Sequence, residues 1–199
     1  MQTALDQRVV AALRRLEEED RTDRADGTPK ESRLRSVTPE VGAFLHLLVK
    51  IAGARRIVEV GMSGGYSTIW LASAAREVAG QVTTLEIDAA KIERAGRNLA
   101  DAGVDDCVTI VEGDANSTLP TLEGPFDLAF LDAEKELYLG LLDPLVRLLR
   151  PGGLLIADNL LSHAKELTGF RAAAESHREL ECVLVPIPRG ELLCRKRSA

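Results

Sequence analysis

Acidic residues stand at or just after the ends of five short apolar runs, and they are the residues of this chain best placed for binding chemistry. They are Glu59, Glu86 with Asp88, Asp114, Asp132, and Asp158 with Asn159. If the runs are parallel strands, their carboxyl ends meet at one edge of a sheet, where α/β proteins bind ligands. Each acid could instead cap the helix that follows its strand. The whole set favours one binding crevice.

A glycine-rich turn follows the first of these runs. Residues 56–67 read RIVEVGMSGGYS, an apolar strand that leads through a turn into a helix. Glycine lets the backbone approach a ligand closely, and a helix start offers unpaired N–H groups. The dinucleotide pattern G-x-G-x-x-G is not met, because Ser63 stands at its second glycine. The turn therefore favours a less phosphorylated ligand, and Glu86, at the end of the next run, is placed to bind two ribose hydroxyls.

Two alternating apolar patterns predict the elements that position these residues. The strand-like runs are 57–60, 82–87, 108–111, 128–131 and 154–157, and the helix-like stretches are 41–52, 67–78, 89–102, 116–119, 137–149 and 170–177. This β-α alternation predicts a parallel sheet covered by helices on both faces. Two last runs, 182–186 and 192–195, flank a turn with proline and glycine and predict a hairpin.

The first 36 residues form a separate part of the predicted organisation. Apolar residues recur there at helical spacing, at Leu5, Val9, Ala12, Leu13 and Leu16. This spacing predicts an amphipathic helix that covers an apolar surface. We expect residues 1–36 to be an N-terminal helix and loop, and residues 37–199 to form one main domain.

Six motifs occur in a characteristic order between residues 37 and 195. They are EVGxxxGYS at 59–67, LEID at 85–88, EGDA at 112–115, FDxxFLDAEKxxY at 126–138, RPGG at 150–153 and DN at 158–159. In combination they resemble class I S-adenosylmethionine-dependent methyltransferases, within them the cation-dependent O-methyltransferases of the catechol and caffeoyl-coenzyme A type. The resemblance implies a Rossmann-like, doubly wound α/β fold. Its seven-stranded sheet is mostly parallel, with an antiparallel strand from the C-terminal hairpin and helices on both faces.

The resemblance also implies a set of residues that hold S-adenosylmethionine. Gly61, Ser63 and Ser67 would hold its methionine end, and Glu86 its ribose. Asp114 and the backbone of Ala115 would frame the adenine. The full implied set of cofactor-binding residues is Val37, Glu59, Gly61, Ser63, Ser67, Glu86, Asp114, Ala115 and Asp132.

A metal site and a catalytic pair follow from the same resemblance. Asp132, Asp158 and Asn159 would bind a divalent cation, with Mg²⁺ expected because their oxygens suit a hard ion. Lys135 and Asp132 match the family's catalytic positions, and Lys135 would take the acceptor proton or hold the phenolate. The simpler interpretation of Lys135 is an exposed helix lysine.

The expected reaction is methyl transfer to a hydroxyl of a small catechol-like or hydroxylated aromatic acceptor. Glu134 and the stretch 160–163 depart from the family pattern on the acceptor side, so the acceptor is not identified. Ser162 resembles a helix cap, which would make His163 an ordinary first-turn residue. Two alternatives remain: a metal-free methyltransferase, and a non-catalytic S-adenosylmethionine-binding module that acts on a partner through its N-terminal helix.

Composition limits the classes of partner. The chain of 199 residues has a net charge of −6, which argues against a nucleic-acid surface. Its start lacks a signal-peptide pattern and no apolar run approaches a membrane span, so we expect a cytoplasmic protein without membrane contact. Cys107, Cys182 and Cys194 show no C-x-x-C spacing and are expected to be buried reduced thiols. A homodimer is the expected assembly of this family.

Overall fold

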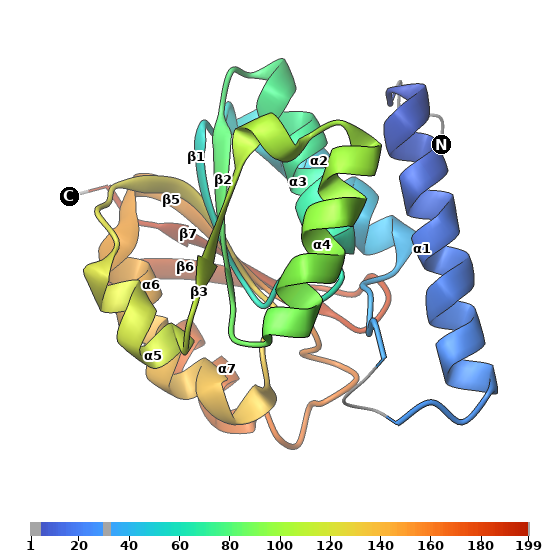
Figure 1. Cartoon of the computed structure of the whole chain (residues 1–199). Coiled ribbons are helices and arrows are strands. Elements are labelled where there is room, and N and C mark those ends of the chain that lie inside the picture. The colour runs from blue at the N-terminus through green and yellow to red at the C-terminus, as the bar shows by residue number, and fades with distance from the viewer. Residues whose placement is uncertain (1–4, 30–32, 199) are drawn as a thin grey trace.

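One seven-stranded sheet forms the centre of the molecule. The computed structural model describes residues 5–29 and 33–198, and the strand order is β3-β2-β1-β4-β5-β7-β6. The strands are β1 (Arg56–Val60), β2 (Gln81–Glu86), β3 (Val108–Glu112), β4 (Phe126–Leu131), β5 (Leu149–Ala157), β6 (Leu180–Val185) and β7 (Glu191–Lys196). Strands β1 to β5 pair in parallel, and β7 pairs antiparallel with β5 and β6 (Figure 1). The predicted fold is confirmed.

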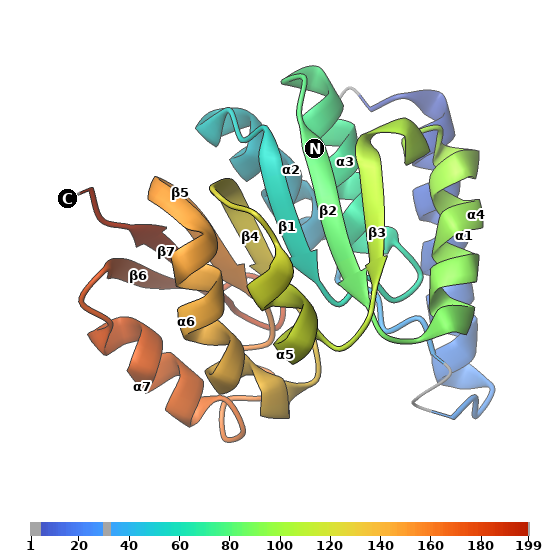
Figure 2. The ribbon, with the colours of Figure 1, turned by 60° about the vertical axis from the view of Figure 1, so that its left-hand side comes forward.

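Helices cover both faces of the sheet (Figure 2). The helices are α1 (Gln7–Ala25), α2 (Pro39–Ala52), α3 (Tyr66–Glu77), α4 (Ala89–Ala102), α5 (Ala115–Thr118), α6 (Tyr138–Leu148) and α7 (Thr168–Ser176), with 3₁₀ turns η2 (Asp105–Cys107), η3 (Leu119–Thr121) and η4 (Lys135–Leu137). Ile57 packs in the core under α2 to α4, and its neighbour Val58 packs in the core under α5 to α7. This alternation is the two-residue period of a strand buried on both faces.

Several helix starts are fixed by side-chain caps. Thr38 accepts a bond from the backbone N–H of Val41 and is followed by Pro39, a favoured first helical residue. Asp88 caps α4, and Asp114 caps α5. The capping interpretation of the strand-end acids is therefore confirmed for these two residues.

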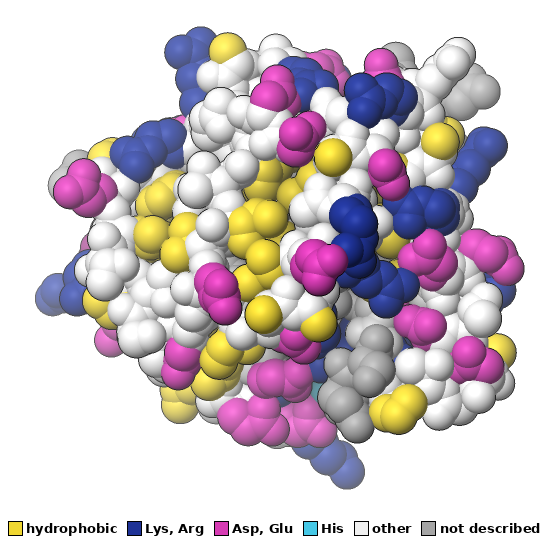
Figure 3. All heavy atoms as spheres, viewed as in Figure 1, with side chains coloured by type: hydrophobic (Ala, Val, Ile, Leu, Met, Phe, Trp, Pro, Cys, Tyr) yellow, Lys and Arg dark blue, Asp and Glu magenta, His cyan; other side chains and the backbone are white. Residues whose placement is uncertain are grey.

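The predicted amphipathic N-terminal helix is confirmed as α1, which packs against α4 and α3. Its buried residues are Val9, Ala12, Leu13 and Leu16. Arg8 donates to the carbonyls of Ala100 (2.6 Å) and Asp101 (3.1 Å), which lie in the last turn of α4. Basic and acidic side chains intermingle over these two helices (Figure 3). Helix α1 is therefore docked by apolar burial and by polar contacts at the end of α4.

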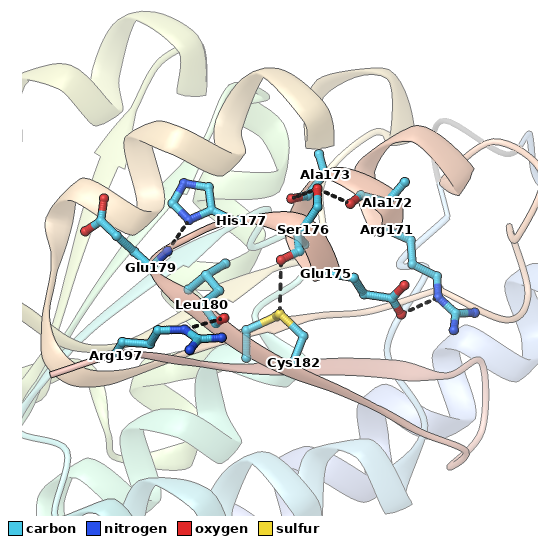
Figure 4. Close-up of a disulfide and its surroundings, with 12 residues drawn as sticks. Arg171, Ala172, Ala173, Glu175, Ser176, His177, Glu179, Leu180, Cys182 and Arg197 are labelled. Carbon is cyan, nitrogen blue, oxygen red and sulfur yellow. Dashed lines mark hydrogen bonds and ion pairs between the residues drawn. A yellow bond between two sulfur atoms is a disulfide. The ribbon is translucent and has the colours of Figure 1, made fainter.

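The C-terminal hairpin corrects the expectation of three reduced thiols. Cys182 on β6 lies directly opposite Cys194 on β7, and the two form a disulfide (Figure 4). The 12-residue separation along the chain hid this pairing, because it depends on the hairpin register. Cys107 is free and buried, as expected. The cysteines therefore give no support to a reducing compartment, and a cytoplasmic location stays a prediction.

Across residues 5–29 and 33–198, no helix has the length and apolar character needed to cross a membrane.

The contact between α2 and α3 gives a prediction for stability. A Cβ on Gly42 would lie 2.3 Å from Trp70 Nε1, so Gly42→Ala should lower the free energy of unfolding by about 1–3 kcal/mol. A Cβ on Gly96, inside α4, would meet no atom within 4 Å. Gly96→Ala should be neutral or stabilise by up to about 1 kcal/mol. Urea unfolding measures both, and equal effects of the two substitutions would contradict this packing.

Candidate functional site

A cavity of about 290 Å³ opens at the carboxyl ends of β1, β2, β3 and β4. The strand order reverses between β1 and β4, and α/β sheets bind ligands at such a point. The cavity is lined by eight of the predicted site residues: Val37, Gly61, Ser63, Ser67, Glu86, Asp114, Ala115 and Asp132. The predicted residues Glu59, Lys135, Asp158 and Asn159 do not line it. The predicted residues thus divide into eight that line the cavity and four that lie outside it.

The glycine turn and the end of β4 touch at the floor of the cavity. Gly61 has φ +96°, and a Cβ there would lie 2.2 Å from the backbone oxygen of Asp132. Only glycine fits this backbone conformation and this approach. The N–H of Asp132 also donates to Val60 O at 3.0 Å. The position of Asp132 in the cavity wall therefore depends on the glycine turn.

Glu59 lies beneath the turn. It is fully buried, and its carboxylate accepts from Ser67 Oγ (2.6 Å), Thr68 Oγ1 (2.5 Å) and Thr84 Oγ1 (2.6 Å). Burial raises the pKa of this carboxyl, and the three hydroxyl donors oppose the shift. The implied direct contact of Glu59 with the cofactor is not what the structure shows: Glu59 fixes Ser67 from below.

Glu86 ties the end of β2 to the glycine turn. Its Oε2 accepts from the backbone N–H of Ser63 at 2.8 Å, and its Oε1 accepts from Ile87 N (2.9 Å) and Asp88 N (3.1 Å). The side chain caps no helix and faces the cavity. Glu86 therefore faces the cavity at the end of β2, and its binding to the ribose stays a prediction.

The segment before α2 closes one side of the cavity, which sequence reasoning missed. Ser63 Oγ donates to Leu34 O at 2.5 Å, and Leu34 is buried against Gly64. Arg35 forms an ion pair with Glu134, and both residues line the cavity. Lining residues thus come from both sides of the predicted boundary at residue 36, so the loop preceding α2 is part of the site.

A polar group lies behind the cavity wall, at the ends of β4 and β5. Asp132 Oδ1 accepts from Lys135 Nζ (3.2 Å) and from Asn159 Nδ2 (2.8 Å). Lys135 also donates to Ala133 O and to the Tyr138 hydroxyl, and only 8% of its side chain is exposed. The interpretation of Lys135 as an exposed helix lysine is therefore wrong. Asp132 connects this group with the cavity.

Asp158 adds a second carboxyl to this group. Its Oδ1 accepts from the N–H of Asn159, and its buried Oδ2 receives no hydrogen bond from the described residues. Glu191, at the start of β7, is equally buried, and neither of its oxygens has a donor among those residues. The carboxyl groups of Asp158 and Glu191 face each other. Burial raises the pKa of both, and the charge of Asp132 adds to the shift.

Sequence reasoning missed Glu191, although the strand direction gave a signal. Because β7 is antiparallel, its first residue lies at the carboxyl end of β5, and Leu192 pairs with Ala157. Glu191 therefore lies at the same edge as the other strand-end acids.

The prediction that Ser162 caps a helix is wrong. Residues 160–167 form turns, and α7 begins only at Thr168. Ser162 Oγ instead lies 3.2 Å from Asn159 Oδ1 and 3.0 Å from His163 Nδ1. Its contact with Asn159 adds Ser162 to the surroundings of the predicted metal ligands.

Comparison with known proteins identifies the family. Residues 18–197 match the sequence profile of a family described as O-methyltransferase. The chain therefore belongs to the O-methyltransferase family.

Individual relatives agree with this assignment. The chain is 46% identical over 127 residues to a protein named catechol O-methyltransferase from Mycobacterium tuberculosis, an alignment that covers 63% of this chain and 57% of that protein. The cofactor-bound structure of Rv0187 from MTB has a TM-score of 0.83 at 33% identity and covers 98% of this chain and 92% of that one. The O-methyltransferase TomG from Streptomyces achromogenes, solved with SAM, has a TM-score of 0.78 at 28% identity and covers 92% and 90%. The matched region spans 57% and 61% of the first two curated relatives.

Glu59 gives a prediction for the pH dependence of stability. Its pKa in the folded protein is raised above the ordinary 4.5, so the neutral carboxyl is favoured by folding. This contribution is present below the unfolded pKa and is lost as pH rises through the folded pKa. The unfolding free energy of the unmodified protein, relative to Glu59→Gln, should therefore fall as pH rises from 4.5. Urea unfolding across pH tests this. In the control Glu93→Gln, at an exposed position, the unfolding free energy should change with pH as it does in the unmodified protein. The same pH dependence for Glu59→Gln and the unmodified protein would contradict the burial argument.

Proposed function

We propose that this protein transfers a methyl group from S-adenosylmethionine to a hydroxyl of a small catechol-like or hydroxylated aromatic acceptor, assisted by a divalent cation. The observation that carries the proposal is the position of Asp132. It lines the cavity on one side and contacts Lys135 and Asn159 on the other. The Asp132 carboxylate thus lies between the cavity and the side chains that could bind a metal ion and handle a proton. The relative named catechol O-methyltransferase supports the acceptor class.

The cavity residues suit S-adenosylmethionine. Glu86 would accept bonds from the ribose hydroxyls, and charged acceptors make the stronger hydrogen bonds. Ser63 and Ser67 would face the methionine end, with Ser67 held in place by Glu59. Asp114 and Ala115 line the part of the cavity expected for the adenine. The neighbour TomG, which was solved with SAM, supports this cofactor.

Asp132, Asp158 and Asn159 fit a divalent cation, with Mg²⁺ expected. Asp158 Oδ2 is buried without a donor from the described residues, and such an oxygen calls for a proton or a cation. Carboxylate and amide oxygens are suitable ligands for a hard ion. Asn159 now directs Nδ2 at Asp132, so the amide would turn to present Oδ1. When bound, such an ion lowers the pKa of an aromatic hydroxyl and favours the phenolate.

Lys135 is positioned to handle the acceptor proton. Its ammonium is buried and is held by Asp132 and by the Tyr138 hydroxyl. At this place the ammonium would hold the phenolate charge close to the methyl donor. To receive the hydroxyl proton instead, Lys135 would first have to give up one proton to solvent and become the neutral amine. Most of the rate would come from orientation, because the cavity wall fixes the acceptor and the cofactor in contact.

A second candidate, a metal-free methyltransferase, is favoured by a separate observation. Asp132 Oδ1 already has two donors, Lys135 and Asn159. A methyl-donor assay on a panel of catechols, with and without chelator, separates the candidates. Turnover that chelator abolishes and Mg²⁺ restores supports the proposal, and full turnover in chelator supports the metal-free reaction. No turnover with any acceptor, despite cofactor binding, would favour a binding module.

A homodimer built from two copies of this chain stays a prediction, which sedimentation of the purified protein measures.

Glu86 gives a prediction for cofactor affinity. Glu86→Ala should weaken S-adenosylmethionine binding by about 1.5–3 kcal/mol, because it removes a charged acceptor for the ribose hydroxyls. Isothermal titration calorimetry measures this loss. Glu93→Ala, at an exposed position of α4, is the control and should bind normally. Unchanged affinity in folded Glu86→Ala would remove Glu86 from the binding site.

Lys135 gives a prediction for catalysis. Lys135→Ala should lower kcat about 10²- to 10⁴-fold, with little change in cofactor affinity, because it removes the group that handles the acceptor proton. Raising the pH should restore part of the rate by supplying phenolate. Lys50→Ala, on α2 away from the cavity, should leave kcat unchanged. A kcat for Lys135→Ala within about threefold of the unmodified value across pH would exclude this role.

A further inference from the structure

Glu191 is a buried acidic side chain beside the predicted metal ligands, and neither the family motifs nor the proposed reaction gives it a role. It is the first residue of β7 and has no solvent exposure. Apart from the carboxyl group of Asp158, the described residues provide no hydrogen-bond partner to either of its oxygens. Burying a carboxyl group without a donor is costly, so such a group needs a compensating charge or proton. Glu191 therefore calls for a proton or a cation beside it.

The neighbours of Glu191 are themselves acidic. Its carboxyl group faces that of Asp158, whose Oδ2 also lacks a donor, and the charge of Asp132 acts on both. The ammonium of Lys135 is directed at Asp132, and Arg189 acts on the two acids through space. Two facing carboxyl groups have only acceptor oxygens when ionised, so a proton or a cation must join them. A cation is already expected beside Glu191, because its neighbour Asp158 is a predicted metal ligand together with Asp132 and Asn159.

We propose that Glu191 is a positioning residue of this cation site, which acts on the bound ion through Asp158 and adds negative charge behind that ligand. The inference rests on the proposed function, because it requires a cation at Asp132, Asp158 and Asn159. Glu191 raises the affinity of the site for a divalent ion. The same carboxyl group destabilises the metal-free protein, because no cation is then present to compensate for its burial beside Asp158. Cation binding and folding stability are thereby coupled through a residue that does not contact the methyl donor.

The hairpin register makes this placement possible. Leu192 pairs with Ala157 in the antiparallel β5–β7 ladder, which brings the preceding residue of β7 beside Asp158. The following residues of β7, Leu192 and Leu193, are apolar and pack in the two cores. An apolar residue at position 191 would therefore pack well in the strand, and the buried acid lowers the stability of the folded protein.

Direct Mn²⁺ binding, followed by electron paramagnetic resonance of the free ion, tests the proposal. Glu191→Gln keeps the shape and removes the charge, and it should weaken Mn²⁺ binding about tenfold or more, as outer partners of metal ligands do. Glu191→Leu should bind at least as weakly. The matched control is Glu181→Gln on neighbouring β6, where the side chain is 57% exposed, and it should bind as the unmodified protein does.

Thermal unfolding provides a second readout that does not use activity. Without metal, Glu191→Leu should be more stable than the unmodified protein, because an unpaired buried acid is replaced by an apolar group. Added Mg²⁺ should raise the melting temperature of the unmodified protein more than that of either variant. Circular dichroism and S-adenosylmethionine binding confirm that the variants are folded, and Glu191→Leu serves as the folded variant if Glu191→Gln does not fold.

The outcomes separate this inference from the proposed function. Mn²⁺ affinity of the Glu191 variants within about threefold of the unmodified value overturns the role of Glu191 and leaves the cation site standing. In that case the two carboxyl groups share only a proton. No Mn²⁺ binding to the unmodified protein overturns the cation site and the role of Glu191 together.

Discussion

The close approach between Gly61 and the backbone of Asp132 is the constraint on which the site depends. The end of β1 and the end of β4 meet there with no room for a side chain, since a Cβ on Gly61 would lie 2.2 Å from Asp132 O. This contact brings the glycine turn and the central carboxylate into one cavity wall. The parallel ladder fixes the backbone on both sides of this contact. A bulkier residue at position 61 could therefore fit only by pushing the two strand ends apart. The cavity and the polar group behind it are therefore parts of one arrangement.

Buried polar contacts hold this arrangement from below and from the side. Glu59 holds the start of α3 through the hydroxyls of Ser67 and Thr68, and Thr84 on β2 joins the same carboxylate. Glu86 connects the turn to β2, and Ser63 connects it to the segment before α2. These contacts favour a rigid turn. The proposed reaction needs that rigidity, because its rate would come mainly from orientation.

Local patterns in the sequence were enough to predict the fold, and the family resemblance supplied eight residues of the cavity wall. Strand and helix periods located every strand, and the motif order led to the residues around the cavity. The features that could not be predicted from the sequence depend on strand register and on side-chain packing. The pairing of Cys182 with Cys194 and the position of Glu191 both require the alignment of β7 with its neighbours. The burial of Lys135 depends on contacts with Ala133 and Tyr138 that no spacing rule specifies. Asp88 and Asp114 are helix caps, and only three-dimensional contacts distinguish them from Glu86.

The central claim is that one crevice holds the methyl donor and a divalent cation on opposite sides of Asp132. Nuclear magnetic resonance of S-adenosylmethionine carrying a carbon-13 methyl group tests it most directly, because paramagnetic Mn²⁺ broadens the signals of nearby nuclei. With the cofactor bound, Mn²⁺ should broaden the methyl signal strongly, Mg²⁺ should reverse the effect by competition, and Asp132→Ala should abolish it. A methyl signal that Mn²⁺ leaves unchanged, while calorimetry shows the cofactor bound, would contradict the account.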